Sequence, residues 1–196
     1  HLPDGYTLKW TGDFENQQRA SKRLAQVVPV SIAIIFVILF ILFSNARDAG
    51  LVLLNVPFAA AGGIIALLIT HFNFSISAGI GFIALFGICI QNGVIMISGI
   101  KSNVRSHIPL SEAVKNTVRS RVRPVVMTAT MAAIGLMPAA LSHGIGSESQ
   151  RPLAIVIIGG VLCDTFFTLF IFPLIVEVIY GKTLYDKEGK LRQRRV

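Results

Sequence analysis

The chain has 196 residues, of which 53% are hydrophobic and 14% are charged. Soluble domains carry roughly a quarter charged residues, so this composition and a mean hydropathy of +0.69 exclude an ordinary water-soluble domain. A net charge of +8 would suggest nucleic acid as the partner of a soluble protein. Here the basic residues lie beside apolar runs, which favours membrane topology over nucleic-acid binding.

The first 25 residues are polar, and we expect them to form a strand followed by a helix. Residues 6–10 alternate apolar and polar side chains, which is typical of a short strand, and Gly12 ends it. Residues 13–25 are predicted to form a polar helix that leads into the first apolar run. The chain has no initiator methionine and no signal peptide. We therefore expect a piece of a longer protein, in which residues 1–25 end a soluble domain.

Five apolar runs follow, each long enough to cross a bilayer as a helix. The hydrocarbon core is ~30 Å thick, so a spanning helix needs ~20 mostly apolar residues. The alternating pattern of a membrane strand is absent, which leaves helices as the spanning structure. The predicted spans are 27–43, 49–70, 78–100, 124–141 and 152–180. The sequence therefore predicts an all-α integral membrane protein, with a five-helix transmembrane bundle over residues 26–180.

The basic residues predict the orientation of these spans. Six lie in the loop 101–123 and six in the tail 181–196, and both segments follow odd-numbered spans. The loops at 71–77 and 143–151 hold Arg151 as their one basic residue. The positive-inside rule places the loop 101–123 and the tail in the cytoplasm and the N-terminus on the other side. Apolar residues at helical spacing in the loop predict a short amphipathic helix along the membrane surface, for which a plain connector is the simpler interpretation.

Small residues are frequent in the spans. Pairs such as Gly62 and Ala66 stand four residues apart, and Gly159 and Gly160 are adjacent. Small residues let helix backbones approach closely where lipid supplies no hydrophobic drive. Glycine recurs every six residues in the third span, at positions 81, 87, 93 and 99. This spacing predicts a third span that is packed on several sides, at the centre of the bundle.

Four polar side chains within the spans are candidates for proton transfer. Such residues are costly inside a bilayer and are usually functional. Asp164, in the fifth span, is interpreted either as a relay group or as a neutral acid bonded to a nearby threonine or carbonyl. Gln91 and Asn92, in the third span, would either hydrogen-bond helices together or order water in a relay. Thr128 lies early in the fourth span.

The sequence offers few ligands for a metal and no pattern for an enzyme. Met127 and Met131 lie four residues apart, and thioethers bind Cu(I), but methionine is more often core filler. His71 and His143 stand alone, so neither predicts a metal site. There is no Walker motif and no nucleophile beside a base at a useful spacing, so we expect no enzyme activity and no cofactor. The two cysteines lie in apolar runs and are expected to stay reduced.

Several stretches resemble the resistance-nodulation-division (RND) transporters, and the heavy-metal efflux branch in particular. Residues 2–20, with LPDGY, WTG and FENQQRA, resemble the exit from the last periplasmic porter subdomain. QNGV at 91–94 resembles the polar centre of the family's tenth helix, and RVRPVVMT at 121–128 resembles the entry to its eleventh. QRPLA at 150–154 resembles the entry to the twelfth and is the most specific for metal pumps. The resemblance covers nearly the whole chain except the basic tail.

The resemblance implies the C-terminal half of the transmembrane domain of a trimeric pump in a Gram-negative inner membrane. Its implied partners are the missing N-terminal half, a periplasmic adaptor and an outer-membrane channel, and protons entering the cell would drive export. The main proton-carrying acids and the substrate-binding domains would then lie outside this chain. By position, Gln91 and Asn92 fall where relatives face those acids, and Thr128 falls where a relay threonine is expected. Gln91 replaces a lysine of multidrug relatives and cannot titrate, and Asp164 is not part of the family's pattern.

The expected function is proton-driven export of cations such as Zn, Co, Ni, Cd, Cu or Ag. Export of organic molecules is the alternative within the same superfamily, and the ligand-bearing domain that would discriminate the two is not in this sequence. A structural fragment that does not transport is an alternative of another class. An intramembrane enzyme is a further alternative, disfavoured because the spans hold no paired catalytic groups.

Overall fold

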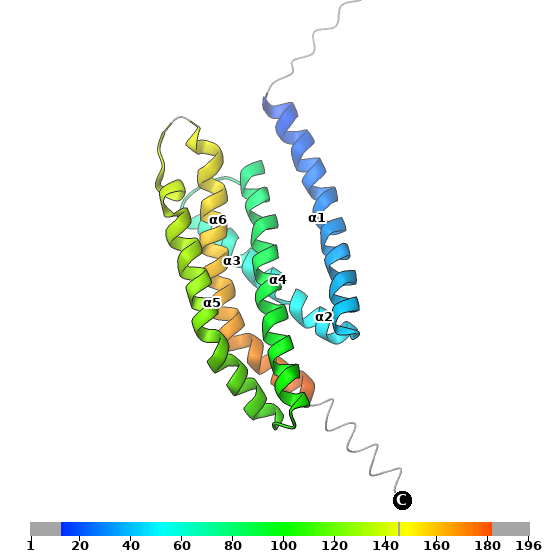
Figure 1. The fold of residues 1–196 in the computed structure, drawn as a ribbon. Coiled ribbons are helices and arrows are strands. Elements are labelled where there is room, and N and C mark those ends of the chain that lie inside the picture. The colour runs from blue at the N-terminus through cyan, green and yellow to red at the C-terminus, as the bar shows by residue number, and fades with distance from the viewer. Residues whose placement is uncertain (1–12, 145, 182–196) are drawn as a thin grey trace, which may run out of the picture.

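A computed structural model describes residues 13–144 and 146–181 (Figure 1). The elements are α1 (Asp13–Phe43), α2 (Ala46–Leu53), α3 (Asn55–Ile69), α4 (Ile76–Arg105), α5 (Leu110–Leu141), α6 (Ser147–Phe166) and the π-helical turn η1 (Phe167–Ile171), after which residues 172–181 continue as α-helix. In this part of the chain, five helical segments are long and apolar enough to cross a membrane. The predicted all-α membrane bundle is confirmed. The strand predicted at 6–10 and the basic tail lie outside the described residues.

The helices extend beyond the predicted spans. Residues 13–25, expected as a lead-in helix, are the first turns of α1. α4 runs on to Arg105 and α5 begins at Leu110, so the amphipathic helix expected within 101–123 is the first part of α5. The chain reverses over residues 106–109, where His107 has a positive φ of 63° and Pro109 caps α5. Pro124 does not start a new helix, because membrane helices tolerate the hydrogen bond that a proline removes.

The second predicted span is divided into two helices, α2 and α3, with a turn at Leu54. Pro57 lies in the first turn of α3 and has no N–H to donate to the carbonyl of Leu53, one turn earlier. The regular hydrogen-bond ladder is therefore interrupted where the two helices meet. On either side of this break, Asp48 and Asn55 are both fully buried.

α6, rather than α4 as predicted, lies at the centre of the bundle and packs against α3, α4 and α5, whereas α1 packs mainly on α2 and α4 at one side (Figure 1). Small residues allow the contact between α3 and α6, as predicted. A Cβ added at Gly62 would lie 2.3 Å from the Cβ of Cys163, and one at Gly159 would lie 2.3 Å from the Cβ of Ala66. Gly87 and Gly135 face open space, so their positions are not explained by packing within this chain.

Candidate functional site

Asp164 of α6 is buried in the centre of the bundle and accepts hydrogen bonds at both carboxyl oxygens. Its exposed fraction is 0%. The side-chain amide of Asn92, on α4, donates to Oδ2 at 2.8 Å. The hydroxyl of Thr168, one turn further along the same helix, donates to Oδ1 at 3.4 Å. The carboxyl group therefore links α4 to α6 at a depth where an unpartnered charge would cost about 2.5–3.5 kcal/mol or more.

The helix changes its winding immediately after this carboxyl group. Thr168 lies in η1, the π-helical turn that starts three residues after Asp164. π-helical turns inside α-helices are often found at functional sites, because the wider turn re-aims side chains. The ring of Phe167 stacks on Phe58 of α3 with centroids 3.9 Å apart, which holds the turn against the bundle. The thiol of Cys89, one turn before Asn92 on α4, lies beside the same carboxyl group.

The structure brings together two of the four residues predicted for proton transfer, Asn92 and Asp164. Gln91 is exposed, because one step along a helix turns a side chain by about 100° away from its neighbour. Thr128 is also exposed, and its hydroxyl donates to the carbonyl of Pro124 at 2.9 Å. Neither residue contacts the buried carboxyl group within this chain.

Met127 and Met131, the weak candidates for a metal site, lie at the surface of the described chain. Met127 is 57% exposed and Met131 71% exposed, and both lie on the outer face of α5. Among the described residues, no three histidine, cysteine, aspartate or glutamate side chains gather closely enough to hold a metal ion. The buried Asp164 carboxyl group is therefore the candidate site, and a carboxyl group can bind and release a proton.

A second buried carboxyl group, Asp48 of α2, was missed by the sequence reasoning. It is 1% exposed, and Lys101 Nζ of α4 lies 2.5 Å from Oδ2. The hydroxyl of Tyr180, from the last helical turns, donates to Oδ1. Lys101 also donates to the carbonyl of Phe43 at 3.5 Å, at the end of α1. The available signal was a carboxylate directly before the predicted second span, where a charge is costly unless it is paired.

Asn55 of α3 is a further buried polar residue, and it lies against α4. Both atoms of its amide are buried without a hydrogen-bond partner. The amide packs on Gly93, where an added Cβ would lie 2.4 Å from Nδ2. Because Gly93 has no side chain, Asn55 fits against α4 at this position. Gly93 follows Asn92, the residue that donates a hydrogen bond to Asp164.

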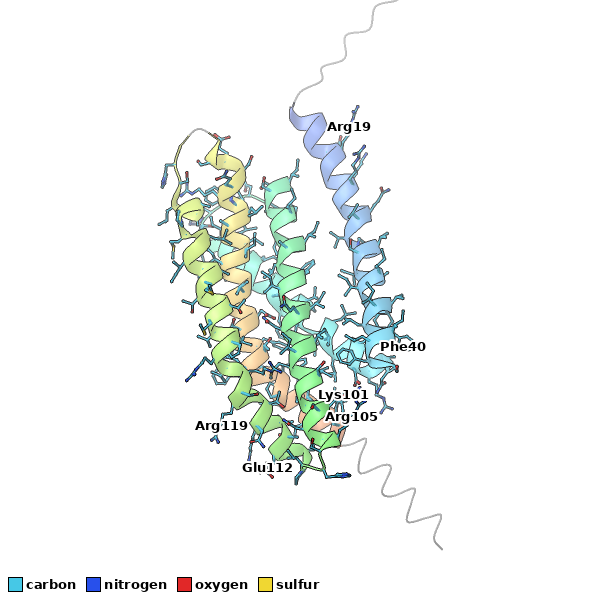
Figure 2. All side chains as sticks on the ribbon, in the orientation of Figure 1. Arg19, Phe40, Lys101, Arg105, Glu112 and Arg119 are labelled. Carbon is cyan, nitrogen blue, oxygen red and sulfur yellow. The ribbon has the colours of Figure 1, made fainter. Side chains whose placement is uncertain are left out.

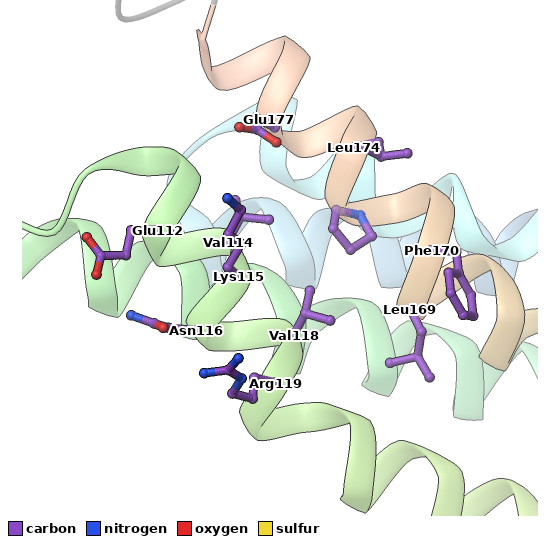
Figure 3. Close-up of a pocket in the computed structure, with 11 residues that line it drawn as sticks. Glu112, Val114, Lys115, Asn116, Val118, Arg119, Leu169, Phe170, Leu174 and Glu177 are labelled. Carbon is purple, nitrogen blue, oxygen red and sulfur yellow. The ribbon is translucent and has the colours of Figure 1, made fainter.

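A cavity of about 750 Å³ lies where the first turns of α5 meet residues 169–177 (Figure 3). Its wall includes Leu169, Phe170 and Leu174. Its charged residues are of both signs: Glu112, Lys115, Arg119 and Glu177. The two carboxylates lie on different helices and do not converge in Figure 3. The cavity therefore has no net charge and no cluster of ligands that would select an ion.

Comparison with known proteins places the chain in a family. A profile of the AcrB/AcrD/AcrF family matches residues 1–180. The chain is 44% identical over 181 residues to the cobalt-zinc-cadmium resistance protein CzcA of Cupriavidus metallidurans, and 46% identical over 182 residues to the protein HelA of Legionella pneumophila. Each alignment covers 92% of this chain and 17% of the relative, so the chain spans about a sixth of the length of these relatives.

The fold is also that of a solved structure. The crystal structure of a heavy metal efflux pump superposes with a TM-score of 0.78 at 44% identity, over 92% of this chain and 18% of that one. A second crystal form of a heavy metal efflux pump gives a TM-score of 0.75 at 42% identity. The resemblance to the heavy-metal branch that the sequence motifs indicated is confirmed. The chain belongs to the AcrB/AcrD/AcrF family, within the heavy-metal branch of the RND efflux pumps.

Proposed function

We propose that this chain is the C-terminal membrane part of a proton-driven pump that exports divalent heavy-metal cations across the inner membrane. The substrate class is supported by the relatives, which include a cobalt-zinc-cadmium resistance protein, a nickel-cobalt-cadmium resistance protein at 41% identity and a nickel and cobalt resistance protein at 42% identity. Metal recognition is assigned to other parts of the pump, because the chain spans about a sixth of these relatives. The chain itself catalyses no covalent change.

The observation that carries the proposal is the buried hydrogen bond between Asn92 and Asp164. When ionised, the Asp164 carboxylate accepts from the Asn92 amide and from the Thr168 hydroxyl. When protonated, one carboxyl oxygen carries an O–H that needs an acceptor of its own. A proton on Oδ1 is accepted by the Thr168 hydroxyl once that hydroxyl rotates, whereas a proton on Oδ2 requires the Asn92 amide to turn and present its oxygen. Proton binding at Oδ2 thus changes the hydrogen bond between α4 and α6.

This local change can act on the rest of the pump through helix packing. α6 packs against α3, α4 and α5, and η1 allows a local change of winding next to the carboxyl group. A proton that favours one packing over the other shifts the population between the two states. We propose that this shift reaches the periplasmic domain through α1, whose first turns precede the first apolar span. Export by rocking of one helical unit against another is common in secondary transporters.

The orientation and partners follow from the same proposal. The ends of α4 and α5 carry Lys101, Arg105 and Arg119 at one end of the bundle, and Arg19 lies at the other end (Figure 2). We place the first group in the cytoplasm by the positive-inside rule, and the start of α1 in the periplasm. The assembly would be a homotrimer with a periplasmic adaptor and an outer-membrane channel. Gln91 and Thr128, both exposed here, would face the N-terminal half of the pump.

The proposal is tested by replacing Asp164 in the complete pump. Asp164→Asn keeps the size of the side chain and one acceptor oxygen but cannot bind a proton. It should abolish resistance to cobalt, zinc and cadmium in cells and metal-driven proton flux in liposomes, while the amount of pump in the membrane is unchanged. Asp164→Glu should keep part of the flux, because it restores a titratable group. Normal resistance with Asp164→Asn would rule out this site. Resistance to organic compounds instead of metals would indicate a multidrug exporter.

A further inference from the structure

A small polar pocket lies between the end of α1 and the last two turns of α4. Its volume is about 330 Å³. Ser98, Lys101, Ser102 and Arg105 line it from α4, at positions i, i+3, i+4 and i+7, which place four side chains on one face of a helix. Ser44, which ends α1 with a positive φ of 53°, lines it from the other side. The pocket thus presents two cationic groups and three hydroxyl groups, all of them hydrogen-bond donors.

Among the described residues, no carboxylate lines this pocket. The Lys101 ammonium is paired with the Asp48 carboxylate, so the net positive charge of the described lining comes from Arg105. Arg105 is exposed, and no ion pair joins it to another described side chain. The cavity between α5 and the last helix, by contrast, balances two acids against two bases. Compared with that cavity, the pocket beside Arg105 has the net positive charge that an anion requires.

The same pocket has an apolar side. Leu42 and Phe43, at the end of α1, complete its lining. Along α1, the apolar residues preceding them, including Val37 and Ile41, are 54% and 71% exposed and form a surface suited to lipid chains. Figure 2 shows Lys101 and Arg105 near the same end of the bundle as Phe40 of α1. A ligand with an anionic head and an apolar tail would meet complementary groups at both ends.

We propose that this pocket binds the phosphate group of an anionic phospholipid headgroup, with the acyl chains along the exposed face of α1. Arg and Lys groups with hydroxyl donors are the usual partners of phosphate oxygens. Basic pockets between transmembrane helices on the cytoplasmic side are known to hold such headgroups. The binding site itself does not depend on the pump being proton-driven. Only one part of this proposal depends on the proposed orientation of the bundle, namely that the lipid comes from the cytoplasmic leaflet.

The test is a lipid titration of the full 196-residue chain in detergent, followed by native mass spectrometry. Phosphatidylglycerol is the anionic probe, phosphatidylcholine the zwitterionic one, and inorganic phosphate the free anion. We expect tighter binding of phosphatidylglycerol than of phosphatidylcholine, and a loss of roughly fivefold in its affinity with Arg105→Gln. Arg105→Lys should retain most of the affinity. The matched control is Arg123→Gln, which removes an exposed cation from α5, on the same side of the bundle but outside the pocket.

Each other outcome would overturn the proposal. An equal loss with Arg105→Gln and Arg123→Gln would mean that lipid responds only to the overall charge. Unchanged affinity with Arg105→Gln would mean that the lipid binds elsewhere. Competition by inorganic phosphate at equal concentration, without any preference for phosphatidylglycerol, would assign the pocket to free phosphate and overturn the lipid source. Lipid binding is measured without metal or a proton gradient. A chain that binds no lipid would therefore refute the lipid site without bearing on the proposed metal transport.

Discussion

Asn92 and Asp164 lie 72 residues apart in the sequence, and the amide of the first donates a 2.8 Å hydrogen bond to the carboxyl group of the second. The bond joins α4 to the central helix of the bundle. Both residues are buried within the bundle, so bulk water is not an easy replacement for either partner. Breaking the bond would leave a polar group unsatisfied inside the bilayer, which is costly. Substitutions at Asn92 or Asp164 should therefore change the free energy of unfolding by a measurable amount.

Asn92→Ala should destabilise the chain by about 1–3 kcal/mol, because it leaves the buried Asp164 carboxyl group without its amide donor. The loss is read from thermal unfolding in detergent. Gln91→Ala is the control, since the neighbouring side chain is exposed and should have little effect. In a double-mutant cycle with Asp164→Asn, the two losses should not add, because both substitutions act on one contact. Strict additivity would mean that the two side chains do not interact.

Lys101→Gln should cost about 3–5 kcal/mol, because it leaves the Asp48 carboxylate buried without its cation. The double variant Asp48→Asn with Lys101→Gln should recover part of this loss, since the uncompensated charge is gone. Urea unfolding in detergent measures the stability of the single variant and of the double variant. Arg123→Gln is the control for the loss of an exposed cation. A double variant less stable than Lys101→Gln alone would contradict the assigned ion pair.

Asn55→Leu should be neutral or stabilising, unlike most changes to a buried residue. Neither atom of the Asn55 amide has a hydrogen-bond partner, so its removal breaks no bond and takes a polar group out of the core. Leucine has a similar size and differs mainly in polarity. The melting temperature in detergent is the measurement. A clear fall in melting temperature would show that the amide has a bound partner, such as a water molecule.

Gly62→Ala should destabilise the chain by about 1–3 kcal/mol, because its new methyl group would meet Cys163 and the carbonyl of Gly159 at less than 3 Å. Gly135→Ala is the matched control. It adds the same methyl group to a helix where no atom lies within 4 Å, so alanine's higher helix propensity should leave stability unchanged or raise it. Equal effects of the two substitutions on unfolding would contradict the close packing of α3 on α6.

The proposed orientation can be read from single cysteines placed in the two kinds of loop. A cysteine at His107, between α4 and α5, should be protected from a membrane-impermeant thiol reagent in whole cells. A cysteine at His143, between α5 and α6, should react. The native cysteines 89 and 163 are replaced by alanine first, so that labelling reports the new sites alone. Labelling at His107 in whole cells would reverse the assigned topology.

Sequence alone predicted the number of spans, because a bilayer imposes a minimum length of apolar chain and forbids any spanning strand that leaves its backbone unpaired. These requirements act locally and can be read one segment at a time. The sequence also identified Asp164 and Asn92 as unusual polar residues within apolar runs. It missed Asp48, because that residue lies one position before the predicted second span, where it was assigned to a loop. The break at Leu54 was missed as well, since Pro57 in an apolar run gives no clear end to a helix.

The tertiary structure decided which polar residues meet. Adjacent residues of a helix point about 100° apart, so sequence could not say whether Gln91 or Asn92 faces Asp164. The rotation of α4 is determined by glycines and apolar side chains that pack against the helices around it, and α6, with which α4 packs most, is distant in sequence. The same packing gathers Asp48, Lys101 and Tyr180 from three segments. Apolar length is a property of one segment, whereas hydrogen-bond partnership inside a bilayer is a property of the assembled bundle.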